Sequence, residues 1–280
     1  MKQTSDELSA ALEALRGRPI VTESRQYAHE WRARGTATRR LVLGAAVAVC
    51  VVACFVFGIP LVAPKTVFAT SVGETRPLVL DDGSRILLDT QSRLRVVFTA
   101  GARDIELLEG QAHFEVAKDS QRPFRVRTGS AEVVAVGTRF DVATLPARTT
   151  VTLIEGRVNV RTLPSAAHSE PQVAAMVPGQ QLGITSDGQL LDQQVVKIEN
   201  VTAWQRGTIV LDDVPLPDAL AAMNRYSATQ IVIPAPGLQS RRVSGVFRVG
   251  DVETEALALQ RYFGLRETSH SDREIVLGRN

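Results

Sequence analysis

The chain has 280 residues, of which 44% are hydrophobic and 22% are charged, and its net charge is only +2. This length suffices for one or two domains, and the nearly balanced charge lacks the strongly basic footprint of a nucleic-acid-binding protein, so we expect no direct nucleic-acid partner. Both cysteines, Cys50 and Cys54, lie in one apolar segment, so the rest of the fold must be held by a hydrophobic core and not by disulfides.

Residues 1–40 are expected to form a cytoplasmic helical tail with eight basic and five acidic residues. Thr4 and Glu7 have the spacing of a capping box at a helix start, and a second short helix is expected from Thr22. Neither helix is long enough to be stable alone in water, so their apolar side chains need a partner surface, either protein or membrane. The alternative is a disordered segment. The candidate partner-binding side chains are Leu8, Leu12, Leu15, Tyr27 and Trp31.

Residues 41–63 are an unbroken run of 23 uncharged residues, long enough as a helix to cross a hydrocarbon core about 30 Å thick. Arg39 and Arg40 precede the run, and basic residues beside a span stay in the cytoplasm. We therefore expect a single transmembrane helix, with the N-terminus cytoplasmic and the C-terminal part exported. Two alternatives remain open. One is a signal peptide cleaved near Ala69, and the other is export through the twin-arginine route.

The next segment, residues 69–200, is expected to be a β-rich domain. Short runs of β-branched and aromatic residues alternate with turn sequences such as Asp81-Asp82-Gly83 and Glu109-Gly110, and no helical pattern intervenes. We expect the second of these turns to separate two strands. The pattern predicts an all-β sandwich, roll or solenoid-like stack.

A different texture begins at Trp204, and residues 204–280 are expected to form a small α+β domain. Apolar residues fall at helical spacing over 215–227 and 251–263, and short strands flank both segments. The predicted order is β-α-β-β-α-β-β. Trp204 is either an anchor at the junction of the two domains or an ordinary core residue.

The sequence lacks the recurring motifs of phosphate, dinucleotide and serine-hydrolase sites, and its four histidines have no ligand-like spacing. We therefore expect no enzyme, no cofactor and no metal site. One peptide bond is a candidate site of self-cleavage. At Gly137-Thr138 a threonine hydroxyl next to a strained peptide can attack the preceding carbonyl, which cleaves the chain through an N→O acyl shift. The alternative is a simple turn or bulge.

Several phrases resemble the FecR family, the membrane-anchored regulators of extracytoplasmic-function sigma factors. They are LVLDDGSRILLDTQSRL at 78–94, IELLEGQAHFEVAKDSQRPFRVRTGSAEVVAVGTRFDV at 105–142, LIEGRVNV at 153–160, VPGQQL at 177–182, AWQRGTIVLDDVPLPDALAAMNRYSATQIVI at 203–233 and RRVSGVFRVGDVETEALALQRYFGL at 241–265. The resemblance implies a FecR-like domain followed by a domain similar to the secretin/TonB short N-terminal (STN) fold.

The resemblance also implies partners. The exported part would sense the signalling domain of a TonB-dependent outer-membrane receptor, and the tail would bind a sigma factor as an anti-sigma factor or activator. Intramembrane and periplasmic proteases, and in some members self-cleavage at a Gly-Thr peptide (here Gly137-Thr138), would transmit the signal, commonly to regulate iron transport. The resemblance therefore implies a single-pass signal transducer of the bacterial inner membrane, with its N-terminus cytoplasmic and its C-terminal domain periplasmic, that is not an enzyme. The alternative is an anchored cell-envelope protein that binds peptidoglycan or polysaccharide and whose tail has no regulatory function.

Overall fold

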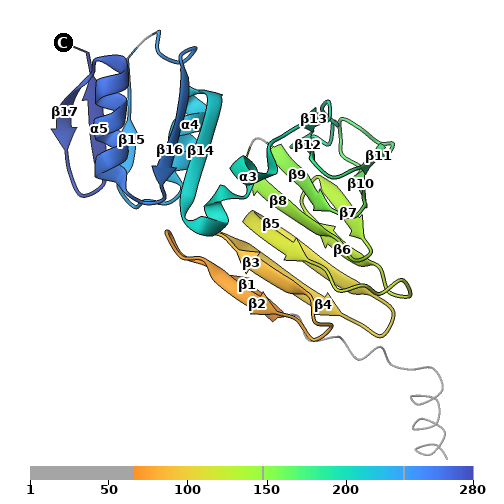
Figure 1. Cartoon of the computed structure of the whole chain (residues 1–280). Helices are drawn as coiled ribbons and strands as arrows, with labels where there is room; N and C mark the ends of the chain where they lie inside the picture. Colours follow the sequence, from red (N-terminus) through yellow and green to blue (C-terminus); the bar gives the residue numbers. More distant parts are fainter. Residues whose placement is uncertain (1–65, 147, 236, 280) are drawn as a thin grey trace, which may run out of the picture. The chain divides into compact units, whose positions relative to one another are not determined.

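The computed structural model describes residues 66–146, 148–235 and 237–279 (Figure 1). The predicted tail at 1–40 and the predicted transmembrane helix at 41–63 lie outside these residues. No helix in the described part is long and apolar enough to cross a membrane. Its longest helix, α5 (Val252–Phe263), has 12 residues and is about 18 Å long, against the roughly 30 Å of a hydrocarbon core. The predicted fold class, which included a single transmembrane helix, is therefore corrected to a mainly β fold with a few short helices.

Thirteen strands of the described chain form one continuous hydrogen-bonded network. Tight turns connect many of them. At Asp81-Asp82-Gly83 the backbone N–H of Leu80 donates to the carbonyl of Ser84 at 2.9 Å, and Gly83 has a φ of +82°. The strands are β1 (Thr66–Ala69), β2 (Arg76–Val79), β3 (Arg85–Leu88), β4 (Arg93–Phe98), β5 (Arg103–Glu115), β6 (Phe124–Arg127), β7 (Ala131–Ala135), β8 (Arg139–Leu145), β9 (Arg148–Glu155), β10 (Val158–Thr162), β11 (Val173–Met176), β12 (Gln180–Thr185) and β13 (Gln194–Val195).

Strand β5 belongs to both halves of this network. Its residues 103–109 pair with β4 and β6, whereas its residues 110–115 pair with β3 and β8. The first half has the strand order β11-β10-β7-β6-β5-β4-β1, and the second has the order β2-β3-β5-β8-β9-β12-β13. The predicted turn at Glu109-Gly110 is wrong, because the chain bends at this point within one long strand. Gly110 permits the bend with a φ of +90°.

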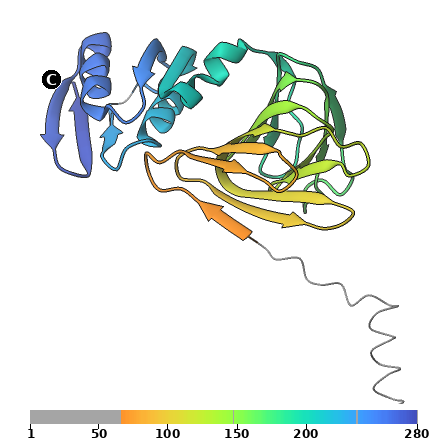
Figure 2. The same cartoon turned by 60° about the horizontal axis from the view of Figure 1, so that its bottom comes forward.

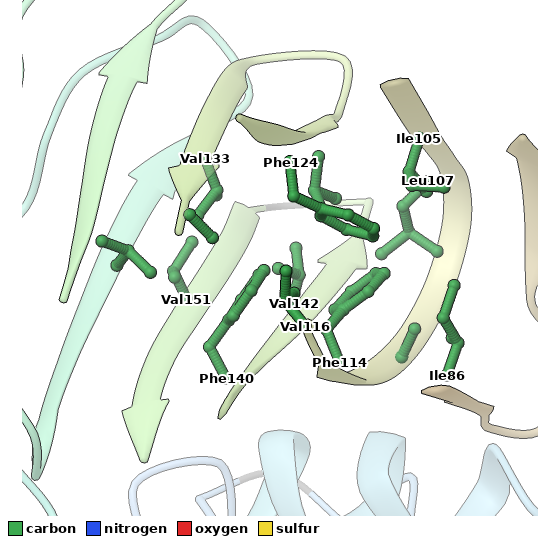
Figure 3. Packing of buried hydrophobic residues seen from close by; sticks show 14 of the residues in the cluster. Ile86, Ile105, Leu107, Phe114, Val116, Phe124, Val133, Phe140, Val142 and Val151 are labelled. Carbon is green, nitrogen blue, oxygen red and sulfur yellow. The ribbon is translucent and has the colours of Figure 1, made fainter. Parts of the chain in front are cut away.

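The core of this β domain lies between the two halves. Figure 3 shows side chains of the first half, such as Phe124 and Val133, pointing toward Phe114 and Phe140 of the second. The Phe114 ring stacks on the Phe140 ring with centroids 5.1 Å apart and meets the Phe124 ring edge-on at 6.1 Å. These three phenylalanines have no exposed surface, so the domain is held by close apolar packing, as expected for a fold without disulfides.

The residues after β13 fold around a second apolar cluster, to which Trp204 belongs. Strands β14 and β16 form a two-stranded antiparallel sheet, and β15-β18-β17 form a second sheet in which β15 runs parallel to β18. Helix α5 lies against this second sheet (Figures 1 and 2). The elements are α3 (Ile198–Val201), η1 (Ala203–Arg206), β14 (Thr208–Pro215), α4 (Leu216–Asn224), β15 (Gln230–Val232), β16 (Arg242–Arg248), α5, β17 (Arg266–His270) and β18 (Glu274–Gly278).

The chain order from β14 onward is β-α-β-β-α-β-β, which is the order expected from the sequence. The side chain of Asp251 accepts a hydrogen bond from the backbone N–H of Thr254 at the start of α5, and Gly264 ends the helix in the left-handed conformation. Local signals of this kind explain why these elements could be located from the sequence.

Candidate functional site

The Gly137-Thr138 peptide connects β7 to β8, where the chain passes from the first half of the β domain to the second. Gly137 has a φ of +73°, a conformation that residues with a β-carbon rarely adopt. A β-carbon at this position would also overlap the side chain of Lys118. The peptide is therefore held in a conformation that requires glycine on its N-terminal side.

Thr138 is buried, with 3% of its surface exposed. Its carbonyl accepts a hydrogen bond of 2.9 Å from the backbone N–H of Val116, but its hydroxyl oxygen Oγ1 has no hydrogen-bond partner among the described residues. A buried hydroxyl without a partner is costly and rare. The sequence could identify the Gly-Thr pair, but it could not reveal that the hydroxyl is left unpaired.

This arrangement suits an intramolecular acyl shift. Thr138 directly follows the Gly137 carbonyl, so the hydroxyl and its target belong to one chain and no second molecule has to be positioned. No hydrogen bond to another described residue competes for the hydroxyl. The product of such a shift is an ester between the Gly137 carbonyl and Thr138 Oγ1, which water can then hydrolyse. Self-cleavage at this peptide stays a prediction.

A second group of polar side chains, which the sequence did not indicate, surrounds Asp89 at the end of β3. The Asp89 carboxylate is fully buried and accepts hydrogen bonds from Arg225 Nη1 at 3.0 Å and from the Tyr226 hydroxyl at 2.7 Å. Arg225 also donates to Gln111 Oε1 at 2.9 Å. We call these four residues the Asp89 cluster. They join the β domain to the end of α4.

Burial within the Asp89 cluster disfavours the charged form of Asp89. Burial raises the pKa of Asp89 above its usual range, although Arg225 and Tyr226 oppose the shift. Burial, with the neighbouring Asp89 charge, likewise raises the pKa of Tyr226. One carboxylate oxygen of Asp89 has no partner in the described chain. The cluster therefore connects the two domains, and its contribution to stability depends on Asp89 keeping both of its hydrogen-bond donors.

Trp204 takes part in a second connection of the same kind. Its indole N–H donates to Asp141 Oδ2 at 2.9 Å, and the other oxygen of Asp141 lies 2.5 Å from His113 Nδ1. All three residues are buried. Trp204 packs in the C-terminal cluster and bonds to the β domain, so it combines the two roles considered for it, junction anchor and core residue.

The other predicted site residues lie outside the described chain. They are the tail residues Leu8, Leu12, Leu15, Tyr27 and Trp31. Within residues 66–279, leaving out 147 and 236, no group of three or more histidine, cysteine, aspartate or glutamate side chains could hold a metal ion.

Comparison with known proteins shows which protein family and which solved structures the chain is similar to. Residues 66–159 match the FecR protein family, so the resemblance to the FecR family is confirmed over this part of the chain. Two crystal structures, each of a candidate anti-sigma factor from Parabacteroides distasonis ATCC 8503, at 2.50 and 1.65 Å resolution, have a similar fold. Each has a TM-score of 0.66 and 26% identity. The alignment with the first structure covers 78% of this chain and 100% of that chain, and the alignment with the second covers 77% of this chain and 99% of that chain. No curated protein matches the chain.

Proposed function

We propose that this protein is a regulatory anti-sigma factor, and that residues 1–40 bind an extracytoplasmic-function sigma factor. The observation that carries the proposal is the similarity to the Parabacteroides distasonis structures, which spans the whole of the first neighbour and 78% of this chain. The match of residues 66–159 to the FecR protein family supports the same role independently.

The finer proposal concerns the signal. The described domains would meet the signalling domain of a TonB-dependent outer-membrane receptor in the periplasm, and residues 1–40 would meet the sigma factor in the cytoplasm. The β14–β16 sheet supports a protein contact, because β16 pairs with no described strand other than β14. An unpaired edge can accept a strand from a partner, and Val246 on β16 is 70% exposed.

The sigma-factor contact is tested in the tail. The full-length chain with Leu12→Asp and Trp31→Ala should lose control of a sigma-dependent reporter, because the apolar side chains that would enter a groove on the sigma factor are removed. A peptide of residues 1–40 should capture the sigma factor from host lysate, and the same peptide with both substitutions should not. Unchanged reporter output in the double variant would refute the proposal.

The receptor contact is tested on β16. Val246→Asp places a charge on the exposed edge with little effect on the core, and we expect it to weaken binding to the purified receptor signalling domain by at least tenfold. Val177→Asp is the matched control, since Val177 is also exposed (56%) but lies in the β domain, next to β11. Equal binding by both variants would exclude this edge as the contact.

We also propose that the chain cleaves itself once at Gly137-Thr138 and turns over no separate substrate. The unpartnered, buried Thr138 hydroxyl supports this second candidate. Purified full-length protein should yield fragments ending at residue 137 and beginning at residue 138 by mass spectrometry, and Thr138→Ala should yield none. Cleavage in Thr138→Ala would assign the cut to a contaminating protease.

A further inference from the structure

We propose that Gly156, in the turn after β9, is a positioning residue for self-cleavage, because the space left by its missing side chain fixes the direction of the Thr138 hydroxyl. This inference rests on the proposed self-cleavage and extends it to a residue far from the Gly-Thr pair in sequence. It concerns only the geometry of the attack, and the proposed sigma-factor role does not depend on it.

The topology brings Gly156 to the reacting peptide. The connection from β7 to β8 carries Gly137 and Thr138, and the connection from β9 to β10 carries Gly156. Strand β8 pairs with β9, and β7 pairs with β10. The two connections therefore pass between the same two halves of the β domain side by side, and the residue pairs Arg139 with Glu155 and Ala135 with Val158 flank them.

The contact between the two turns is close. A β-carbon at Gly156 would lie 2.7 Å from the Thr138 methyl carbon Cγ2, 3.2 Å from the Gly137 carbonyl oxygen and 3.3 Å from Thr138 Cα. Carbon atoms that are not bonded to each other normally stay about 3.5 Å or more apart. The turn therefore leaves room for a hydrogen atom at this position and not for a methyl group.

This contact determines where the hydroxyl points. The Thr138 β-carbon carries a methyl group, a hydroxyl and a hydrogen in three staggered positions, and β-branched side chains have few allowed rotamers. Because the threonine β-carbon is chiral, seating the methyl group against Gly156 leaves a single position for the hydroxyl. No hydrogen bond to another described residue holds Oγ1, so packing of the methyl group is the restraint that the structure offers.

The reaction balances without a co-reactant other than water. Thr138 Oγ1 forms a bond to the Gly137 carbonyl carbon, the Gly137–Thr138 C–N bond breaks, and the hydroxyl proton ends on the released amine. Water then splits the ester, which leaves a carboxylate at Gly137 and restores the hydroxyl of Thr138. A methyl group at position 156 would push Thr138 Cγ2 and the Gly137 oxygen away from their places, and small misplacements of reacting atoms cost large factors in rate.

The test compares two glycine variants of the full chain. Gly156 has a φ of +88° and Gly179 has a φ of +85°, but a β-carbon at Gly179 would meet nothing within 4 Å. Gly179→Ala is therefore a control for backbone strain alone. We expect Gly156→Ala to slow the appearance of the two fragments by a factor on the order of 10–100, and Gly179→Ala to leave the rate within about twofold, as measured by intact mass over time.

A third variant separates positioning from general damage to the fold. Serine lacks the methyl group of threonine, so Thr138→Ser should remove most of the clash with Ala at position 156. We expect the double variant to cleave within a few-fold of Thr138→Ser alone. Equal rates for the Gly156→Ala and Gly179→Ala variants, or no rescue by serine, would overturn this inference and leave self-cleavage intact. Absence of fragments in the wild-type protein would overturn both.

Discussion

Asp89 is the residue whose removal should most disturb the junction of the two described domains. Asp89→Ala deletes the acceptor shared by Arg225 and Tyr226, and breaking a buried ion pair on one side typically costs 3–5 kcal/mol. Since Arg225 keeps Gln111 and Thr90 as acceptors, we expect a loss near the lower limit, about 3 kcal/mol, in the free energy of unfolding measured in urea. Tyr226→Phe should cost only about 1 kcal/mol.

Asp192 provides the control for this measurement, because its side chain is exposed. Asp192→Ala should change stability by less than about 0.5 kcal/mol. If Asp89→Ala proved as harmless as this control, the Asp89 cluster would contribute nothing to the connection between domains.

The buried Glu255 should make the stability of the folded protein depend on pH. It is 1% exposed, and neither carboxylate oxygen has a partner in the described chain. Burial, with the charge of Asp251, raises its pKa to about 7. The folded state therefore holds a proton that the unfolded state has released, so stability is highest below about pH 4.5 and falls as the pH rises through 7.

Glu255→Gln should remove this dependence. The loss available between the two pKa values is up to about 3 kcal/mol, which corresponds to roughly 5–10 °C in Tm. We expect the wild-type Tm to fall between pH 5 and pH 8, and the variant to be the more stable protein at pH 8. Glu170→Gln, at an exposed position with no ion-pair partner in the described chain, should keep the wild-type slope. A wild-type Tm that is the same at both pH values would contradict the prediction.

At the scale of elements, β5 is the strand that defines the β domain. It pairs with four other strands because it changes partners at Gly110. A β-carbon at this position would overlap Ser92, including its backbone, and the φ of +90° disfavours any other residue. Gly110→Ala should therefore destabilise the protein by about 3 kcal/mol or more in urea unfolding.

Gly101 serves as the matched control for β5. It lies in the turn before the strand, a β-carbon there meets nothing within 4 Å, and its φ is not in the left-handed region. Gly101→Ala should be neutral or slightly stabilising, because it restricts the unfolded chain. If both alanine variants had the same stability, the bend at Gly110 would not require glycine.

The elements also show what a sequence can reveal. Strand β4 could be predicted with its observed bounds, 93–98, because it contains two valines and a phenylalanine and the turn at Gly101 follows it. The bend in β5 could not, since Glu109-Gly110 has the composition of a turn, and only pairing with distant strands keeps the chain extended. The Asp89–Arg225 contact spans 136 positions, and no local pattern indicates it.

At the scale of the whole molecule, the strand order determines what a cut at Gly137-Thr138 would do. The cut separates β1–β7 from β8–β18, yet β5 pairs with β8 along residues 110–115, and β7 pairs with β10 along residues 131–135. The apolar core also draws on both sides of the cut, as the stacked rings of Phe114 and Phe140 show. The two fragments therefore share two hydrogen-bonded ladders and one core.

We expect fragments 1–137 and 138–280, produced from separate genes in one cell, to copurify as a one-to-one complex that separates only in denaturant. The control divides the chain after residue 196, where no strand pairing of the described residues crosses the division, so only side-chain contacts such as the Asp89 cluster would hold the halves, and they should separate during purification. Copurification is measured with an affinity tag on one half and quantitative mass spectrometry of the other. Separation of the 1–137 and 138–280 pair under native conditions would mean that the backbone connection, and not the ladders, holds the β domain together, and cleavage would then release the C-terminal part.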